Sequence, residues 1–463
     1  MPKNKGLSII IVGCGKVGIT LVEQLSREGH DITVIDKNPA LVEHISGTYD
    51  VMGVVGNGAS YSIQKEAGIE NTDLIIAVTE SDELNLLCCT VAKRVANCSA
   101  IARVRTPDYN QDINYLQERL GLAMIFNPEL ECAREAARML SLPTALEIAS
   151  FAHGQAVLVT FKIPADNKLD GMMLWDMNKT IPAEIEQNVV ICAVERGGEV
   201  YIPSGNFCLQ CGDEVSFVST RKIARKFLRS VGFKTRQVRS TMIIGGGRSS
   251  YYLAQELLAM GLEVKIIEKN RQRCEELCEL LPDAAIINGD GTNEVLLTEE
   301  GIEYAESVVA LTGIDEENIL LTLHARNVSN AKVITKINRI NFRSAINTLD
   351  LGSVLYPRYI TSEAIVAYVR AKHNSMNSNV ETLNYICDNR VEAVEFRVNE
   401  ASAATGTMLK DLKPRMKQDI LIASINREGQ ILIPSGMDTI EVGDSVMVVT
   451  THSGFNDILD ILD

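Results

Sequence analysis

The sequence predicts an α/β protein with two doubly wound parallel-sheet domains, each followed by a small α+β domain. Three observations predict it. A glycine-rich loop stands between an apolar strand and a helix, a second version of that stretch follows 232 residues later, and short strands with turn residues follow each version. A chain of 463 residues is also too long for one hydrophobic core, which favours several domains.

The first strand is predicted over Ile9–Val12 and leads into the loop Gly13-Cys-Gly-Lys-Val-Gly18. The apolar run is typical of a parallel strand buried on both faces. In a Rossmann-like domain the first glycine permits a tight turn, the second lets the backbone approach a pyrophosphate, and the third allows close helix–strand packing. The helix predicted over Gly18–Glu28 would direct its free N–H groups and positive dipole end at the phosphates.

An acidic residue ends the second predicted strand, Asp31–Asp36, and stands 18 residues after Gly18. A carboxylate at this place accepts hydrogen bonds from the hydroxyls of a ribose and repels a 2′-phosphate. The pattern therefore favours NAD(H) over NADP(H). The alternative is a degenerate domain that has lost its ligand.

The rest of the larger domain continues the alternation of strands and helices. Strands are predicted over Val51–Val55, Leu74–Val78 and Ile101–Arg105, and a helix over Glu83–Ala96. The carboxyl ends of such strands border the ligand crevice, so Thr79 and Arg103 are candidate contacts to phosphate or ribose, with Arg105 as the competitor of Arg103. Their alternative reading is a surface threonine and a solvated arginine.

The second copy repeats the same signals. Gly245 and Gly247 correspond to the first two glycines of the loop, and Glu268 corresponds to Asp36, because 268 − 36 is 232. Three later blocks repeat as well: Gly56-Asn-Gly58 in Gly289-Asp-Gly291, Ala77-Val-Thr79 in Ala310-Leu-Thr312, and Glu83-Leu-Asn85 in Glu316-Glu-Asn318.

The second loop departs from the first at one position. Ser250 replaces the third glycine, so we expect looser helix packing and a poorer fit for NAD. Arg248 is placed to neutralise phosphates, and Lys336 is the counterpart of Arg103. The nucleotide bound there need not be the one bound by the first copy.

Residues of about 146–231 and 380–463 read as short strands separated by turns, which indicates two small α+β domains for ligand binding or dimerisation. A short helix is predicted to start over Leu169–Met173, with Leu174 following. Between the larger and smaller domains, Asn127–Leu140 and Tyr356–Val369 each begin near a proline and carry an apolar stripe. They are interpreted as crossover helices that reach a partner domain, and the alternative is core packing within their own domain.

No catalytic or metal-binding constellation is evident from the sequence. The six histidines stand apart, and no Ser/His/Asp or Cys/His arrangement is found. The pair Cys208 and Cys211 has the spacing of a metal or redox motif, but the second half has no cysteines at the related place, so incidental cysteines are the preferred reading. We expect no catalytic residues and no metal.

Charge and hydropathy exclude several classes of partner. The net charge of −15, with no basic patch, argues against binding to nucleic acid. The apolar runs are too short to span a bilayer, and the N-terminus has no signal-peptide pattern. The expected location is cytoplasmic, with any membrane association made through a partner.

The tandem order of domains, the loop at Gly13–Gly18, Asp36 and the segment Ala77-Val-Thr79 together resemble the Trk potassium-uptake regulators, the cytosolic subunits of bacterial K⁺ transport systems. That family is built from RCK domains, each with an N-terminal Rossmann part and a C-terminal part. The resemblance extends over essentially the whole chain. It divides the chain into RCK N-terminal and C-terminal domains over residues 1–126, 127–235, 236–355 and 356–463.

The resemblance implies a homotetramer that docks on a Trk-type membrane subunit, is peripheral to the inner face of the membrane, and binds NAD(H) together with ATP or ADP. It also implies the following contacts: Gly13, Cys14, Gly15, Lys16, Val17, Gly18, Asp36, Thr79, Glu80 and Arg103 in the first copy, and Gly245, Gly246, Gly247, Arg248, Ser249, Glu268 and Thr312 in the second.

The function expected from the resemblance is regulation of potassium uptake by bound nucleotides. The rival hypothesis is an NAD-dependent dehydrogenase with two Rossmann halves, which would need a proton-transfer residue beside the nicotinamide. A nucleotide sensor for some other transporter is a third possibility.

Overall fold

The computed structural model describes residues 6–110, 112–233, 235–338, 346, 349, 351–373, 379–387 and 390–463. The predicted domain ranges 1–126 and 236–355 therefore include residues outside the described ones, and the four-domain division stays a prediction. By compactness the chain forms two units, Met1–Ala133 with Tyr356–Val366, and Arg134–Leu355 with Ala367–Asp463.

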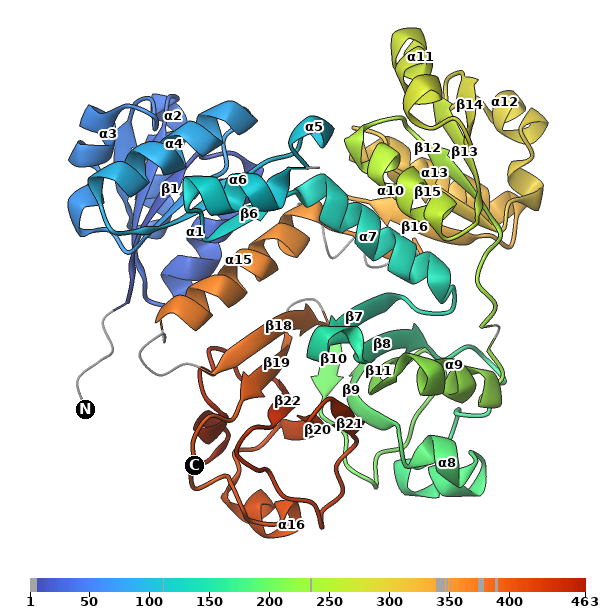
Figure 1. Ribbon diagram of the computed structural model, residues 1–463. Coiled ribbons are helices and arrows are strands. Elements are labelled where there is room, and N and C mark those ends of the chain that lie inside the picture. Colours follow the sequence, from blue (N-terminus) through green and yellow to red (C-terminus); the bar gives the residue numbers. More distant parts are fainter. Residues whose placement is uncertain are drawn as a thin grey trace. The chain divides into compact units, whose positions relative to one another are not determined.

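The first larger domain is built on a six-stranded parallel sheet in the order β3-β2-β1-β4-β5-β6 (Figure 1). Its strands are β1 Ser8–Val12, β2 Asp31–Asp36, β3 Met52–Val55, β4 Leu74–Ala77, β5 Ser99–Arg103 and β6 Met124–Phe126. Its helices are α1 Lys16–Arg27, α2 Pro39–Tyr49, α3 Tyr61–Glu66, α4 Asp82–Val95, α5 Pro107–Asn110 and α6 Ile113–Leu120. The strand order reverses between β1 and β4, and ligands of such sheets bind beside the carboxyl ends of the strands at this point.

The second larger domain repeats this sheet in the order β14-β13-β12-β15-β16-β17, again all parallel. Its strands are β12 Ser240–Ile244, β13 Glu263–Glu268, β14 Ala285–Asn288, β15 Ser307–Ala310, β16 Lys332–Lys336 and β17 Ser353–Leu355. Its helices are α10 Arg248–Ala259, α11 Arg271–Leu280, α12 Glu294–Glu299 and α13 Asp315–Val328. The duplicated parallel sheets confirm the predicted fold of the larger domains.

Two predicted boundaries in the first copy are wrong by a few residues. The first helix begins at Lys16, not at Gly18, because Gly15 is the extended residue that precedes it, with φ −72° and ψ −171°. The strand predicted over Ile101–Arg105 is β5, which ends at Arg103. Arg105 therefore lies in the loop after the strand.

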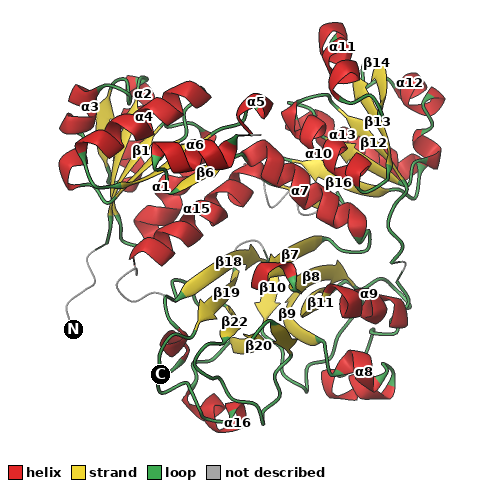
Figure 2. Cartoon of the chain, in the orientation of Figure 1, coloured by secondary structure: helices red, strands yellow, loops and turns green. Residues whose placement is uncertain are grey.

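The two smaller domains each contain a five-stranded sheet, in the orders β10-β9-β11-β8-β7 and β18-β19-β22-β20-β21 (Figure 2). The first has β7 Glu147–Phe151, β8 Ala156–Lys162, β9 Val190–Arg196, β10 Glu199–Tyr201 and β11 Glu214–Thr220, with helices α8 Ala183–Glu186 and α9 Arg221–Ser230. The second has β18 Val380–Ile386, β19 Val391–Arg397, β20 Ile420–Arg427, β21 Gln430–Leu432 and β22 Ser445–Thr450, with the helix α16 Leu409–Leu412. The predicted crossover helices are α7 Pro128–Ser141 and α15 Pro357–His373.

The short helix predicted to start over Leu169–Met173 begins only at Leu174. A 3₁₀ helix runs over Leu174–Lys179, and Met173 before it forms an isolated antiparallel bridge with Cys208. Gly171 has a left-handed backbone, with φ +73°, and its N–H donates to the Leu209 carbonyl at 2.9 Å. This local pairing with Cys208 and Leu209 takes the hydrogen-bonding groups that an earlier helix would have used.

The two small sheets share one hydrophobic core within the second compact unit. Buried members come from both, among them Leu158 and Cys192 of the first and Ala393 and Met447 of the second. The buried Glu395 carboxylate accepts the backbone N–H of Ala152 at 3.1 Å across this core. The two small domains therefore stabilise each other inside one chain.

A half-buried lysine joins the second larger domain to the segment that precedes β7. The Lys332 ammonium donates to the Ser353 hydroxyl at 2.8 Å and to the Ala145 carbonyl. The Ser353 hydroxyl in turn donates to the Leu146 carbonyl at 2.7 Å. Burial, and secondarily the charge of Arg326, lowers the pKa of Lys332 from 10.5 to about 7.

This lysine should make stability depend on pH. In the unfolded chain Lys332 is charged up to about pH 10.4, whereas the folded chain releases its proton near pH 7, so stability rises with pH between these values. We expect wild-type protein to gain up to roughly 2–3 kcal/mol more unfolding free energy than Lys332→Met between pH 7 and 9. Urea unfolding of both proteins at several pH values measures the difference. Parallel curves would contradict the assignment.

Within the described part of the chain, no helix is long and apolar enough to cross a membrane. The same residues contain no group of three or more His, Cys, Asp or Glu side chains arranged to hold a metal ion. Cys208 is half-buried, Cys211 is exposed, and both are free thiols.

Candidate functional site

The first glycine loop follows β1 and lies against the end of β4. Gly13 has φ +106°, and a Cβ atom there would stand 2.9 Å from the Thr79 backbone nitrogen. A Cβ on Gly18 would stand 2.0 Å from the Gly13 carbonyl oxygen, so the third glycine lets α1 pack on the loop. A Cβ on Gly15 would meet nothing within 4 Å, and no side chain caps the helix there. The N-terminus of α1 is thus approachable by a ligand.

The carboxylate of Asp36 holds this loop in shape. One oxygen accepts the Cys14 N–H at 2.6 Å and the other accepts the Asn38 N–H at 2.9 Å. Each carboxylate oxygen has further lone pairs for a ribose hydroxyl. The buried Cys14 thiol has its pKa raised to about 12, first by burial and then by the Asp36 charge, so it is no nucleophile at neutral pH.

Thr79 and Arg103 are connected through a buried asparagine. The Asn85 side-chain oxygen accepts the Thr79 N–H at 2.8 Å and the Thr79 hydroxyl at 2.7 Å. Its amide nitrogen donates to the Arg103 carbonyl at 2.9 Å. Asn85 therefore ties the loop after β4 to the end of β5, and the Arg103 guanidinium donates to the Thr79 carbonyl beside it.

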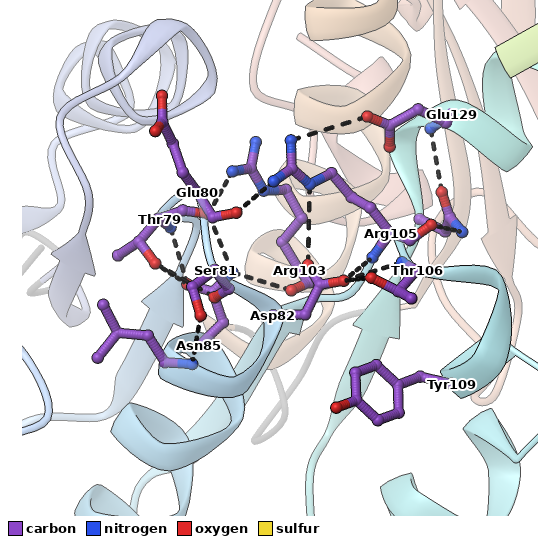
Figure 3. A network of polar contacts seen from close by, with 12 residues as sticks. Thr79, Glu80, Ser81, Asp82, Asn85, Arg103, Arg105, Thr106, Tyr109 and Glu129 are labelled. Atoms are coloured by element: carbon purple, nitrogen blue, oxygen red, sulfur yellow. Dashed lines mark hydrogen bonds and ion pairs between the residues drawn. The ribbon is translucent and has the colours of Figure 1, made fainter. Parts of the chain in front are cut away.

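A second arginine extends this network toward α7 (Figure 3). Arg105 donates to the Glu80 carbonyl, and its Nε lies 3.7 Å from an Asp82 oxygen. Its Nη1 lies 4.0 Å from an oxygen of Glu129 in the first turn of α7. Burial alone would raise the pKa of Asp82, but hydrogen bonds from Thr106 and Arg105 outweigh it and lower the pKa, so this carboxylate is ionised at neutral pH.

Two guanidinium groups thus stand next to each other at the end of β5. The pKa of Arg103 is lowered to about 10, first by burial and then by the charge of Arg105. The Arg103 Nε is buried and has no hydrogen-bond partner among the described residues. A bound anion would stabilise both charges, which is the chemistry that suits a phosphate.

The structure brings the candidate residues of the first copy to one edge of the sheet. The glycine loop follows β1, Asp36 ends β2, Thr79 and Glu80 follow β4, and Arg103 ends β5. Lys16 and Val17 begin α1, where Lys16 is exposed. Their role as nucleotide contacts stays a prediction.

The second copy reaches the same loop geometry with different residues. The Glu268 carboxylate accepts the Gly246 N–H at 2.6 Å and the Asn270 N–H at 2.6 Å. A Cβ on Gly246 would lie 2.9 Å from the Glu268 Cγ, so the longer acid occupies the space that Cys14 fills in the first copy. Thr312 N–H donates to Asn318 at 2.9 Å, as Thr79 does to Asn85.

A small residue at position 246 leaves room for the longer acid at position 268. Substitutions at these two positions are therefore expected to have coupled effects on stability. We expect Gly246→Ala to lower the unfolding free energy of the second domain by roughly 1–3 kcal/mol, because its Cβ would also lie 2.8 Å from Leu277. Adding Glu268→Asp, which shortens the acid but leaves the contact with Leu277, should recover part of the loss. Gly247→Ala, where a Cβ meets nothing within 4 Å, is the matched control. Urea unfolding measures all four proteins, and a double variant no better than Gly246→Ala would contradict the size argument.

The expected looser packing at Ser250 is not observed. Ser250 is fully buried, and the Gly245 N–H still donates to the Ile267 carbonyl at 2.8 Å, as Gly13 does to Ile35. The added hydroxyl oxygen is buried without a hydrogen-bond partner among the described residues. The replacement of glycine by Ser250 therefore leaves a buried hydroxyl without a hydrogen-bond partner among the described residues, and it does not loosen the packing of the helix.

The surroundings of the second loop also differ in charge. Arg248 is exposed at the start of α10, and Ser249 beside it is buried. The Arg273 Nε donates to the Gly246 carbonyl at 2.8 Å, so a cation lies on this loop. Lys336 donates to the Leu311 carbonyl at 3.0 Å, in the manner of Arg103 in the first copy.

Sequence reasoning did not assign a role to the two asparagines, Asn85 and Asn318. Both are fully buried and make the same three connections between the loop and the following strand. The sequence feature that could have identified them is the repeated block that ends in Asn85 and in Asn318. The same block is also compatible with the ordinary start of a helix.

Family models match most of the chain. The TrkA-N domain matches residues 9–128 and 241–357, and the TrkA-C domain matches residues 158–232 and 393–463. A Trk system potassium uptake protein TrkA homolog of Archaeoglobus fulgidus is 32% identical over 443 residues, covering 96% of this chain and 97% of that protein.

Solved structures of the GsuK channel share the fold. One covers 97% of this chain and 78% of the channel chain, with a TM-score of 0.64 and 17% identity. A second, described as the GsuK channel bound to NAD, has a TM-score of 0.62 with the same identity and coverage.

Proposed function

The chain belongs to the TrkA family of Trk system potassium uptake proteins, and from this premise we propose that it is a nucleotide-binding regulatory subunit. Bound NAD(H), with ATP or ADP as a further ligand, would favour one arrangement of its domains. That arrangement would open or close a potassium pathway in a membrane subunit. A ligand shifts such an equilibrium only by its different affinities for the two arrangements.

The observation that carries the proposal is the pairing of an approachable glycine loop with two adjacent arginines at the same sheet edge. The loop of Gly13–Gly18 would hold a pyrophosphate on the N-terminus of α1, and Asp36 would accept the ribose hydroxyls. Arg103 would supply positive charge to a phosphate. The proposed contacts of the second copy are the loop Gly245–Ser249, Glu268 and Thr312.

The proposed partner is a Trk-type potassium-transporting membrane subunit, to which a homotetramer of this chain would dock from the cytoplasm. The proposal requires no catalytic residue. The rival dehydrogenase requires a group that exchanges a proton near pH 7 beside the nicotinamide. Two titratable groups of the first crevice do not suit that task, because the pKa of Asp82 is lowered and that of Cys14 is raised to about 12.

Potassium uptake tests the proposal. Cells from which this chain is deleted should lose K⁺ uptake at low external K⁺, and wild-type chain supplied in trans should restore it. Asp31→Ala, at the exposed start of β2, should restore it equally, whereas Asp36→Ala should restore it poorly. Full uptake in the deletion strain would overturn the proposal.

A further inference from the structure

We propose that Arg105 couples anion binding in the first crevice to the crossover helix α7, by exchanging the Glu129 carboxylate for a phosphate of the ligand. The inference rests on the proposed function, because it needs a nucleotide in that crevice. It adds a route by which occupancy of the crevice is communicated to the helix that leads to the next domain.

Among the described contacts, the Arg105 side chain meets the Glu80 carbonyl, the Asp82 carboxylate and the Glu129 carboxylate, and these contacts differ in closeness. The Glu80 carbonyl is part of the backbone. Asp82 is buried and is fixed by the Arg105 N–H at 2.9 Å and by the Thr106 N–H at 2.8 Å and hydroxyl at 2.7 Å. Glu129 makes the longest contact, at 4.0 Å, and has a half-buried carboxylate on a helix end. An entering anion would therefore displace Glu129 first (Figure 3).

The start of α7 is connected to the same residue by a second contact. The Asn127 side-chain oxygen accepts the N–H groups of Glu129 and Leu130, each at 3.1 Å, and so caps the helix. The Asn127 amide nitrogen donates to the Arg105 carbonyl at 3.4 Å. A change in the position of Glu129 therefore acts on the helix end that the buried Asn127 caps.

The described residues of the second half do not repeat the pair formed by Arg105 and Glu129. Asn338 stands where Arg105 does, since its N–H donates to Asp315 at 2.9 Å as that of Arg105 donates to Asp82. Arg358 follows the proline that begins α15, as Glu129 follows the proline that begins α7. The matched positions therefore carry an asparagine and an arginine where the first half carries an arginine and a glutamate.

Hydrogen exchange of the amides of residues 127–133 tests the inference, with NADH as the probe and calorimetry as the measure of binding. In wild-type protein NADH should speed this exchange about two- to fivefold, the size expected for loss of a partly exposed ion pair. In Glu129→Gln the exchange should be fast already without NADH and should not respond to it. NADH affinity should rise about two- to fivefold, because the competing carboxylate is gone.

Two further variants separate coupling from general effects. Arg105→Asn introduces the residue of the second half, which satisfies an equivalent aspartate there, and it should also abolish the exchange response. Glu118→Gln removes an exposed charge from α6 and should behave as wild type.

A persistent response in Glu129→Gln, or weaker NADH binding by it, would overturn the inference. If wild-type protein binds NADH but residues 127–133 do not respond, only the inference fails. If wild-type protein binds neither NADH nor ATP or ADP, the proposed function fails with it.

Discussion

Replacement of Gly13 by alanine is expected to lower the unfolding free energy of the first larger domain by roughly 2–4 kcal/mol. The backbone there has φ +106°, which side chains rarely adopt, and the new Cβ would stand 2.9 Å from the Thr79 nitrogen and 3.0 Å from the Val78 carbonyl carbon. Both contacts are with backbone of the adjacent strand end, which cannot move aside as a flexible side chain can. Urea unfolding followed by circular dichroism measures the change.

Gly15→Ala is the matched control for this prediction. It lies in the same loop, has extended backbone, and its Cβ would meet nothing within 4 Å. It should change the unfolding free energy by less than about 1 kcal/mol. Equal losses from both substitutions would show that the close approach at Gly13 does not determine the stability of the loop.

Asp36→Ala is expected to weaken NADH binding by roughly 10- to 100-fold, the cost of losing charge-assisted hydrogen bonds to a ligand. The carboxylate both fixes the glycine loop through the Cys14 N–H at 2.6 Å and stands where a ribose would be recognised. Isothermal titration calorimetry measures the affinity. Asp31→Ala, at the opposite end of β2, should leave it unchanged.

The stability of Asp36→Ala decides how that result is read. If the variant unfolds with wild-type free energy and still binds NADH with wild-type affinity, Asp36 is no ligand contact. NADH would then be held by other groups of the first crevice, whereas no binding of NADH by the wild-type protein would mean that this crevice recognises a different nucleotide, with ATP and ADP next to be tested.

Much of the fold could be predicted because the repeat and the glycine loop are local signals with a strong physical cause. An apolar strand, a loop that needs glycine at Gly13 and an acid at the end of the next strand occur together in both halves. The ends of the helices and strands are harder to predict. The first helix begins where the glycine loop leaves the extended backbone, which is after Gly15 and not at Gly18. The segment near Leu169 was missed because its partner, Cys208, is distant in sequence.

The sequence predicts which residues lie at the strand ends of the candidate site, but it does not predict the contacts between them. Asp36, Thr79 and Arg103 follow from strand ends in a sheet of known order. The contact of Arg105 with Glu129 depends on how the loop after β5 meets the start of α7, and no periodicity encodes it. The compensation between Gly246 and Glu268 likewise becomes visible only when distances are known.

The central claim is that this chain binds a nucleotide and does not consume it. One measurement tests it most directly: titration of the purified full-length chain with NADH, with cofactor fluorescence reporting binding and absorbance reporting oxidation during a long incubation with cell-extract metabolites. The account predicts saturable binding that depends on Asp36, with the absorbance of NADH unchanged. Steady loss of NADH absorbance that requires the protein would contradict it and would favour the dehydrogenase.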